Sequence, residues 1–166
     1  MKPTVLRFLN AASRNPGLLA VILFRVQTDA LERGKRGRAE RLRGMNHFLT
    51  GVDFVVGAKA GPGLLIHHPN GIVVGRGAKI GANCTLLQQV TLGERYLDQR
   101  GPSAYPTLED GVTVGAGARL LGGIVIGQGS NIGANSVVLI DVPPGHSAVG
   151  SPARVLKNRA IEEREE

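Results

Sequence analysis

The feature that most constrains this chain is a six-residue period in its aliphatic side chains. From Val74 an aliphatic residue recurs at every sixth position to Leu92, and the series resumes at Leu108 and runs to Val138. Upstream, the same step joins Phe54, Ala60 and Ile66. A period of six fits neither an α-helix nor an alternating strand, and it is typical of a parallel β-helix with one short strand and one turn per hexapeptide. The sequence therefore predicts an all-β domain over residues 51–150, with three hexapeptides per coil and four to five coils.

The composition agrees with such a coil. The chain has 24 glycines, no tryptophan and only 4% aromatic residues, so small branched side chains must fill the core. Glycine suits tight corners because it adopts backbone conformations that other residues avoid. The runs Gly75–Gly81 and Gly127–Gly133 look like nucleotide-binding loops, but neither leads into a helical pattern, as a dinucleotide loop would. We interpret them as corners of the repeat.

The residues before and after the repeat do not keep the period of six and are predicted to be helical. The first fifty residues have helical spacing of their aliphatic side chains, which predicts helices over 3–10, 16–32 and 35–49. A short closing helix is expected over 153–164. The chain thus divides into a basic helical segment (1–50), the β-helix domain (51–150) and a C-terminal extension (151–166).

All of the net charge lies in the N-terminal segment. Residues 1–50 carry ten Lys/Arg and three Asp/Glu, which accounts for the whole net charge of +7. Such a segment suits an anionic membrane surface, or it is simply a solvated helical face. Nucleic acid is not expected as a partner, because the segment has no stacking platform and no recognisable binding motif.

No secretion or membrane-spanning signal is convincing. The longest early apolar run, Gly17–Phe24, has eight residues, whereas a spanning helix needs roughly 20. The single cysteine, Cys84, allows no internal disulfide and fits a reducing compartment. We expect a cytoplasmic protein, with contact at the inner face of the membrane as an option.

Two breaks in the repeat are the candidate sites. Two extra residues follow the pair His67-His68, and a long excursion runs from Glu94 to Pro106. Loops that leave a regular scaffold often carry function. An imidazole there can act as a general base, and Asp53, a little less than one coil earlier, is its predicted carboxylate partner. The alternative is that the two histidines only fill a turn.

The other reactive side chains point to no further chemistry. A metal site needs at least three convergent ligands, and His47 and His146 lie outside or at the end of the coils. No metal is therefore predicted. Cys84 has no base placed near it in the sequence, so we interpret it as a buried filler.

Several segments together resemble a known family. They are AKAGPGLLIHHPNGIVVG at 58–75, LLQQVTLG at 86–93, PTLEDGVTVGAGARLLG at 106–122, IGANSVVLIDVPPG at 132–145 and VGSPARV at 149–155. In this order they resemble the serine acetyltransferase-like branch of the left-handed β-helix, hexapeptide-repeat acyltransferases. The resemblance implies a left-handed coil, a homotrimer with active sites between adjacent prisms, and acetyl-CoA as the acyl donor.

The resemblance also implies residue roles. His68 matches the general base, Asp53 its orienting acid, and backbone N–H groups near Gly93 the donors to the oxyanion. Glu94 stands where the family has a second glycine. The positions that would hold CoA are Gly115, Ala116, Ala134, Ser151, Arg154 and Lys157.

Departures from the family pattern bear on the acceptor. The family's aspartate before the catalytic histidine is here His67, and its Arg-His before the loop-closing proline is Ala104-Tyr105. The missing charges are those that would bind the ammonium and carboxylate of an amino acid. The short basic N-terminus and the altered loop are similar to those of polysaccharide-biosynthesis O-acetyltransferases.

The sequence therefore predicts an acetyl-CoA-dependent O-acetyltransferase acting on a carbohydrate hydroxyl of an exopolysaccharide or capsule precursor. The acceptor would be a small or lipid-linked sugar, bound by His67, Tyr105 and Arg95. Two alternatives remain open. One is a serine O-acetyltransferase of cysteine biosynthesis, and the other is a non-catalytic trimeric scaffold.

Overall fold

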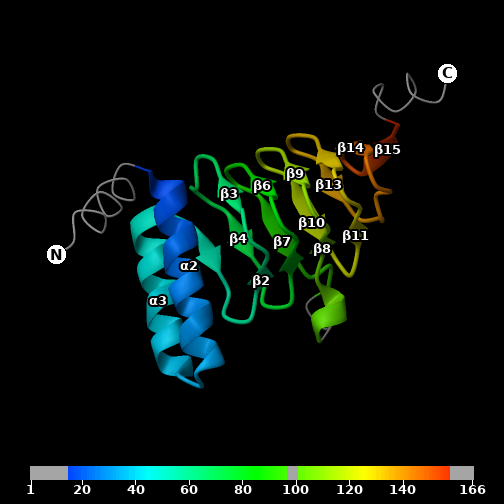
Figure 1. Ribbon diagram of the computed structural model, residues 1–166. Coiled ribbons are helices and arrows are strands. Elements are labelled where there is room, and N and C mark those ends of the chain that lie inside the picture. Colours follow the sequence, from blue (N-terminus) through cyan, green and yellow to red (C-terminus); the bar gives the residue numbers. More distant parts are fainter. Residues whose placement is uncertain (1–14, 97–100, 158–166) are drawn as a thin grey trace.

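Two helices stand at one end of a stack of short strands in the computed structural model, which describes residues 15–96 and 101–157 (Figure 1). Helix α2 spans Pro16–Glu32 and helix α3 spans Arg36–Thr50. Asn15 caps α2 by accepting a hydrogen bond from Leu18, and α3 ends at Gly51 in the left-handed conformation. The helices predicted over 16–32 and 35–49 are confirmed, whereas the one predicted over 3–10 lies outside the described residues.

The strands form a three-sided prism. Sheet A contains, in spatial order, β1 (Asp53–Phe54), β4 (Val73–Val74), β7 (Thr91–Gly93), β10 (Arg119–Leu121) and β13 (Val137–Val138). Sheet B contains β2 (Lys59–Ala60), β5 (Lys79–Ile80), β8 (Thr107–Leu108) and β11 (Val125–Ile126). Sheet C contains β3 (Leu65–Ile66), β6 (Thr85–Leu86), β9 (Thr113–Val114), β12 (Asn131–Ile132), β14 (Ser147–Gly150) and β15 (Ala153–Leu156).

Successive strands pass from sheet A to sheet B to sheet C and back, and every pair is parallel except β14–β15. The chain thus completes a coil every three strands, and β1 to β13 make a little more than four coils. The predicted left-handed parallel β-helix of four to five coils is confirmed.

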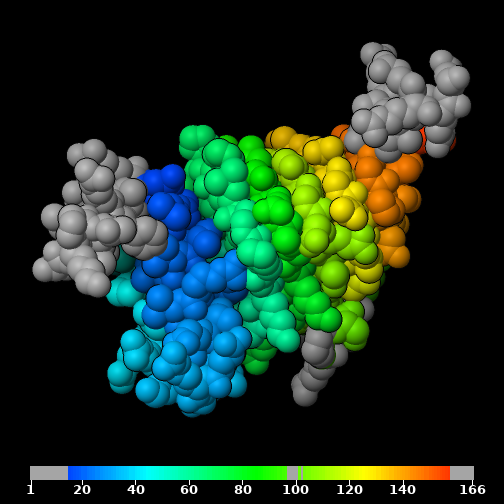
Figure 2. Space-filling view, in the orientation of Figure 1, coloured from blue at the N-terminus to red at the C-terminus, as the bar shows by residue number. Residues whose placement is uncertain are grey.

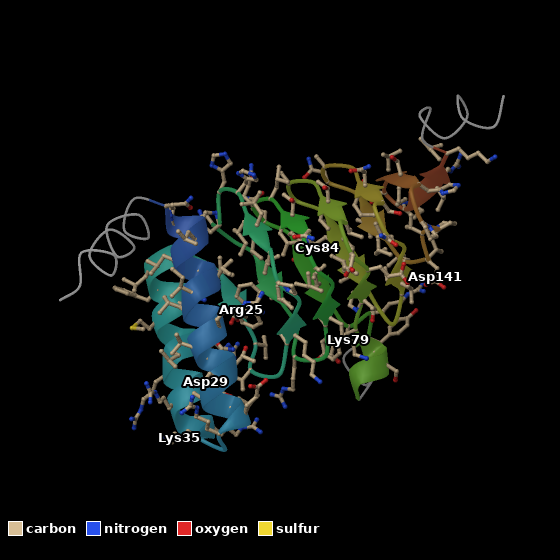
Figure 3. All side chains as sticks on the ribbon, viewed as in Figure 1. Arg25, Asp29, Lys35, Lys79, Cys84 and Asp141 are labelled. Carbon is tan, nitrogen blue, oxygen red and sulfur yellow. The ribbon has the colours of Figure 1, made fainter. Side chains whose placement is uncertain are left out.

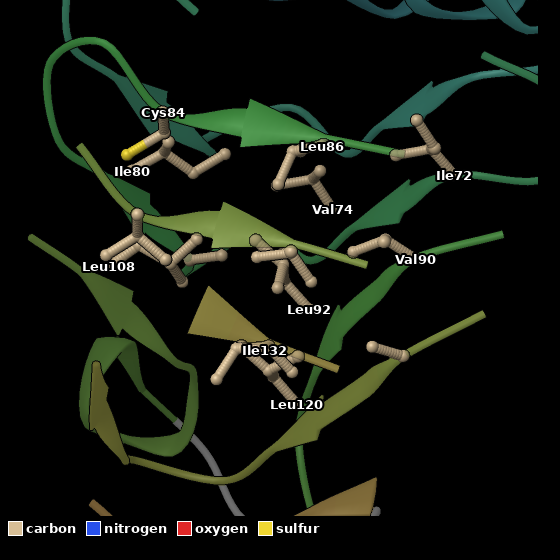
Figure 4. Packing of buried hydrophobic residues seen from close by; sticks show 14 of the residues in the cluster. Ile72, Val74, Ile80, Cys84, Leu86, Val90, Leu92, Leu108, Leu120 and Ile132 are labelled. Carbon is tan, nitrogen blue, oxygen red and sulfur yellow. The ribbon is translucent and has the colours of Figure 1, made fainter. Parts of the chain in front are cut away.

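The core is a column of aliphatic side chains at the predicted six-residue positions (Figure 4). In sheet A the register places Val74, Leu92, Leu120 and Val138 on one another, and each is fully buried. Ala60 is the exception in the series, since it is only partly buried beneath the helices. The period of six therefore marks the inward-facing side chain of each strand.

The helices close the open end of the prism. The rings of Phe24 and Phe54 stack with centroids 4.2 Å apart, and Gln27 Nε2 donates to the carbonyl of Phe54 at 3.0 Å. The Arg25 guanidinium donates to the carbonyls of Ala60 and Gly61, between α2 and the first coil (Figure 3). Helices and coils form one continuous body on the face shown in Figure 2. Helices α2 and α3, residues 16–50, thus belong to the same folded unit as the coils.

The C-terminal end differs from the sequence prediction. A closing helix was expected over 153–164, but Ala153–Leu156 forms β15, which pairs antiparallel with β14. Strand β14 is the last strand of the parallel stack in sheet C, and a hairpin satisfies the backbone groups along its edge. The helix prediction is therefore wrong for residues 153–156, and 158–164 lie outside the described residues.

We expect Phe24→Ala to lower the free energy of unfolding by about 3–5 kcal/mol, because the ring is buried and leaves a cavity at the helix–prism junction. Phe48→Ala is the matched control: Phe24 is 1% exposed and Phe48 is 87% exposed. The control should change stability by no more than about 0.5 kcal/mol. Chemical denaturation of both variants measures the difference, and equal losses would contradict a closed prism end.

Candidate active site

His68 lies in an insertion at the corner between sheet C and sheet A. The N–H of His67 donates to the carbonyl of Leu86, and that of Gln89 donates to the carbonyl of Asn70, each at 3.0 Å. Residue 67 therefore lies beside residue 87 of the next coil, and residue 70 beside residue 88. His68 and Pro69 are the two extra residues, so the insertion has the predicted length but begins at His68 itself and not after the histidine pair.

The backbone at His68 is unusual for a non-glycine residue. Its φ is 51°, in the left-handed region, and its imidazole is exposed. Asn83, Gln89 and Asn135 adopt the same region at other corners, so it is the conformation of a tight corner in these coils, occupied here by a larger side chain. The insertion therefore presents the His68 ring to solvent beyond the regular edge of the coil.

Asp53 has a partner other than the one predicted. Its carboxylate accepts from Arg43 Nε at 2.6 Å and from Arg43 Nη2 at 2.8 Å. Within residues 15–96 and 101–157 no hydrogen bond joins Asp53 to His68, so the predicted contact is not made in this chain. The reason is the docking of α3 across β1, which brings a guanidinium to the carboxylate and forms a bidentate pair. Arg43 is a residue that sequence reasoning missed, because no spacing rule relates the helix to the strand.

The Arg43 pair fixes the charge of Asp53. The hydrogen bonds from Arg43 hold the pKa of Asp53 below its usual value against partial burial, and the charges of Arg43 and His47 act in the same direction. The pKa of Arg43 is raised in turn, mainly by the hydrogen bond to Asp53. The two residues line a hollow of about 250 Å³ together with Glu40, Gly44 and His47. Asp53 is thus an ionised carboxylate at neutral pH.

All the predicted CoA residues except Lys157 lie along the edge that carries His68, which we call the C–A edge. Gly117 donates to the carbonyl of Gln88, and Asn135 donates to that of Ala116, each at 2.8 Å. A Cβ at Gly115 would lie 2.7 Å from the nitrogen of Ala134, so these two residues touch across successive coils. Ser151 and Arg154 belong to the exposed end of the β14–β15 hairpin at the same edge, whereas Lys157 follows β15 at the opposite end of that hairpin, beyond Ser147. The corners of the C–A edge form the upper rim of the coils in Figure 1.

Gln88 is a further polar residue of the C–A edge that sequence reasoning passed over. Its Oε1 is buried and has no hydrogen-bond partner in the part of the chain that the structure describes. In the next coil it lies beside Asn70, which directly follows the two inserted residues His68 and Pro69. Buried acceptors are nearly always paired, so an unpaired one beside a candidate base indicates a position suited to a donor from outside the chain.

The remaining predicted residues lie on the opposite rim of sheet A, the A–B edge. Gly93 ends β7, and a Cβ there would meet Leu121 and Thr91 only at an ordinary 3.6 Å, so packing within the chain does not require glycine. The excursion begins after Gly93 and returns through the 3-10 turn η1 (Pro102–Ala104) to Tyr105. Arg95 is exposed, with its guanidinium 5.4 Å from the centroid of the Tyr96 ring.

Two departures from the family pattern contact each other at this edge. The Tyr105 hydroxyl donates to Glu94 Oε1 at 2.6 Å. The Tyr105 ring lies against Gly75 and Gly77, where an added Cβ would come within 2.5 Å and 2.3 Å of ring atoms. The hydrogen bond to Glu94 raises the pKa of Tyr105, burial adds to this, and the charge of Arg76 opposes it. Glu94 and Tyr105 thus pin the base of the excursion to the corner of the preceding coil.

The predicted site residues therefore fall into two groups. The candidate base and the CoA residues other than Lys157 share the C–A edge, whereas Gly93, Arg95 and Tyr105 share the A–B edge on the other side of sheet A. In Figure 1 the turn η1 is on the lower rim, away from the β3–β4 corner. A single chain does not bring the two groups together.

Other reactive groups stand apart from both edges. Cys84 is buried inside the coil, its thiol donates to the carbonyl of Glu109 at 3.1 Å, and burial raises its pKa. Among the described residues no three His, Cys, Asp or Glu side chains are grouped to hold a metal ion.

Comparisons with known proteins give the family. Residues 105–139 match the model of the bacterial transferase hexapeptide (six repeats) family. The serine acetyltransferase of Helicobacter pylori is 40% identical over 143 residues, covering 85% of this chain and 81% of that protein. The structure of soybean serine acetyltransferase complexed with serine superposes with a TM-score of 0.81 and 42% identity. It is matched over 85% of this chain but only 57% of its own length. A serine acetyltransferase complex with CoA has a TM-score of 0.79, 36% identity and 57% coverage of that chain.

The chain belongs to the serine acetyltransferase-like hexapeptide-repeat acyltransferases. The resemblance seen in the sequence is confirmed, and so is the predicted enzyme class of acetyl-CoA-dependent acyltransferases.

The prediction of a carbohydrate acceptor is wrong. The relatives that match most of the chain are serine acetyltransferases at 39–40% identity, which favours the alternative of a serine O-acetyltransferase. The predicted role in polysaccharide biosynthesis rested on that acceptor and is therefore not supported either. The error came from treating the lost charges at positions 67 and 104 as lost amino-acid binding. The A–B edge carries other charges, those of Glu94, Arg76 and Arg95.

The Arg43–Asp53 pair makes stability depend on pH. Since the folded-state pKa of Asp53 is lowered, its stabilisation is present above the unfolded-state pKa of about 3.9 and is lost as pH falls through the folded value. At pH 7 we expect Asp53→Asn to cost on the order of 1 kcal/mol, because the pair is partly exposed. In denaturation measured from neutral to acid pH, the difference in free energy of unfolding between Asp53→Asn and wild type should shrink. Glu32→Gln, at an exposed helix position, is the control, and a gap constant with pH would refute the ion pair.

Proposed function

We propose that this protein is a serine O-acetyltransferase, which transfers acetyl from acetyl-CoA to the hydroxyl of L-serine. The observation that carries the proposal is the 40% identity to a serine acetyltransferase over 85% of this chain. The exposed His68 in its insertion, beside a row of small residues, supports it structurally. The products are O-acetylserine and CoA.

His68 is the proposed general base. Its imidazole takes the proton of the serine hydroxyl as the oxygen attacks the thioester carbonyl. The carbon–sulfur bond then breaks, and the CoA sulfur leaves as a thiolate that accepts the proton held by the His68 imidazolium, which returns the base to its neutral form. Asp53 is proposed as the acid that orients the base in the assembled enzyme, and Arg43 keeps that acid ionised. Backbone N–H groups near Gly93 are the proposed donors to the oxyanion.

A homotrimer is the proposed assembly. The two groups of site residues lie on opposite rims of sheet A, so each site would form where the C–A edge of one prism meets the A–B edge of its neighbour. CoA would lie along the C–A edge, against Gly115, Ala116, Ala134, Ser151 and Arg154. Lys157, at the other end of the hairpin, is a further proposed contact. The solved serine acetyltransferase complex with CoA supports this cofactor assignment. Acetyl-CoA is a cytoplasmic metabolite, and we place the enzyme there.

Serine needs one anionic and one cationic partner for its ammonium and carboxylate. We assign these roles to the A–B edge, to Glu94 and to the guanidinium groups of Arg76 and Arg95. His67 and Tyr105 remain the proposed neutral contacts to the acceptor. Tyr105 also holds Glu94 in place through its 2.6 Å hydrogen bond.

His68→Ala should lower kcat for serine-dependent CoA release by about 10²–10⁴-fold, the usual contribution of a general base. His146→Ala is the control, since His146 lies at the far end of the coils with Nδ1 near the carbonyl of Pro144. CoA release assayed with L-serine and with a panel of sugars separates the outcomes. Release only with sugars would overturn the serine acceptor, and no turnover with any acceptor would favour the scaffold alternative.

Glu94→Gln and Arg76→Gln test the charges assigned to the acceptor. Each should raise KM for serine by roughly ten- to a hundredfold, since a hydrogen bond to a charged group is lost, and leave KM for acetyl-CoA unchanged. Glutamine at 94 keeps an oxygen for Tyr105, so the loop should stay in place. Lys79→Gln, an exposed cation in sheet B, is the control. Unchanged serine KM in both variants would contradict the assignment.

A further inference from the structure

Helix α3 has a face with no partner in the described structure. Arg38, Arg41, Met45, Phe48 and Leu49 recur at spacings of three and four, so they share one side of the helix, which we call the outer face. Phe48 is 87% exposed, Leu49 53% and Met45 42%. The opposite side carries Ala39, Asn46 and Thr50, which are buried against α2 and the first coil. The outer face is thus a cluster of large apolar side chains that the fold leaves in water.

The charges around this cluster are of one sign. Helix α3 has no acidic residue in its first turn, and its N-cap, Lys35, makes no side-chain capping bond. Lys35, Arg36 and Arg38 therefore surround the positive end of the helix dipole, which is unfavourable for an isolated helix. Glu40, the single acid of α3, lies 3.6 Å from Arg43, on the side that faces Asp53. The cations of the outer face have no neutralising group on their own helix.

We propose that the outer face of α3 docks on an anionic lipid bilayer. An interfacial helix places large apolar residues at the boundary of the acyl chains and basic residues among the lipid headgroups. Met45, Phe48 and Leu49 supply the first set, and Arg38 and Arg41 the second. Neither described helix is long and apolar enough to cross a membrane, so the contact is peripheral.

Other occupants fit the face less well. A second copy docking face to face would bring arginine against arginine. A nucleic acid would leave Phe48 and Leu49 without an apolar partner. The helices stand at the opposite end of the prism from β14 and β15, so a bilayer on α3 lies away from the β14–β15 hairpin (Figure 1). The proposal does not depend on the identity of the acceptor.

Phe48→Trp gives a direct test, because the chain has no tryptophan and the variant carries a single reporter. The full-length variant is titrated with vesicles of phosphatidylcholine mixed with phosphatidylglycerol, and with phosphatidylcholine alone. We expect a blue shift of the emission with the anionic vesicles, weakened by salt, and none with the neutral ones. Leu65→Trp, at an exposed apolar site of β3, is the matched control and should not shift.

The roles of Arg38 and Arg41 are tested in the Phe48→Trp variant. Adding Arg38→Gln and Arg41→Gln should lower vesicle partitioning about 25-fold, at roughly fivefold for each basic side chain near an anionic surface. Adding Lys79→Gln should leave it unchanged. All substituted side chains are exposed, and thermal melts verify that each variant is folded.

Three results would overturn the proposal. The first is no blue shift of the Phe48→Trp emission with anionic vesicles. The second is an equal shift for the Leu65→Trp control. The third is vesicle partitioning that does not change when Arg38 and Arg41 are replaced. Analytical ultracentrifugation without lipid identifies a different occupant. If Phe48→Trp or the arginine substitutions lower the number of subunits, the outer face is an interface between copies of this chain and not a membrane surface.

Discussion

Every other feature of the molecule depends on the stacking of inward aliphatic side chains in register from one coil to the next. Because each strand is only two to four residues long, no strand could persist alone; it is held by the parallel neighbours above and below and by the column inside. The column also fixes where the corners fall. Any residue added between two strands must bulge outward at a corner, since the register of the strands themselves cannot shift without exposing the column.

That constraint explains why the candidate site was visible in the sequence. An insertion in a strict six-residue period is an outward bulge by necessity, so the period alone places His68 at a corner of the coil. The same logic placed the long excursion after Gly93, whereas Ala116 and Ala134 were proposed only from the family resemblance. The helices 16–32 and 35–49 were equally readable, because their aliphatic spacing and the Thr50-Gly51 end are local signals.

Contacts between the helices and the coils, and between the last coil and the chain after it, could not be predicted from the sequence. The partner of Asp53 depends on the angle at which α3 crosses the first coil, and no residue spacing encodes that angle. The hairpin of β14 and β15 depends on an edge that exists only once the last coil is complete. The acceptor was misjudged for a related reason. The absence of charges at two positions was visible, whereas the clustering of Glu94 and Arg76 around Tyr105 required the fold.

The niche that holds Tyr105 has a consequence for substitutions in this chain. The ring fits only where positions 75 and 77 both lack a side chain, and the ring in turn gives Glu94 its hydrogen bond. In this chain the four positions are therefore coupled. A side chain added at either glycine would displace the ring and with it the hydrogen bond to Glu94, and at Gly75 it would also meet the backbone oxygen of Leu92.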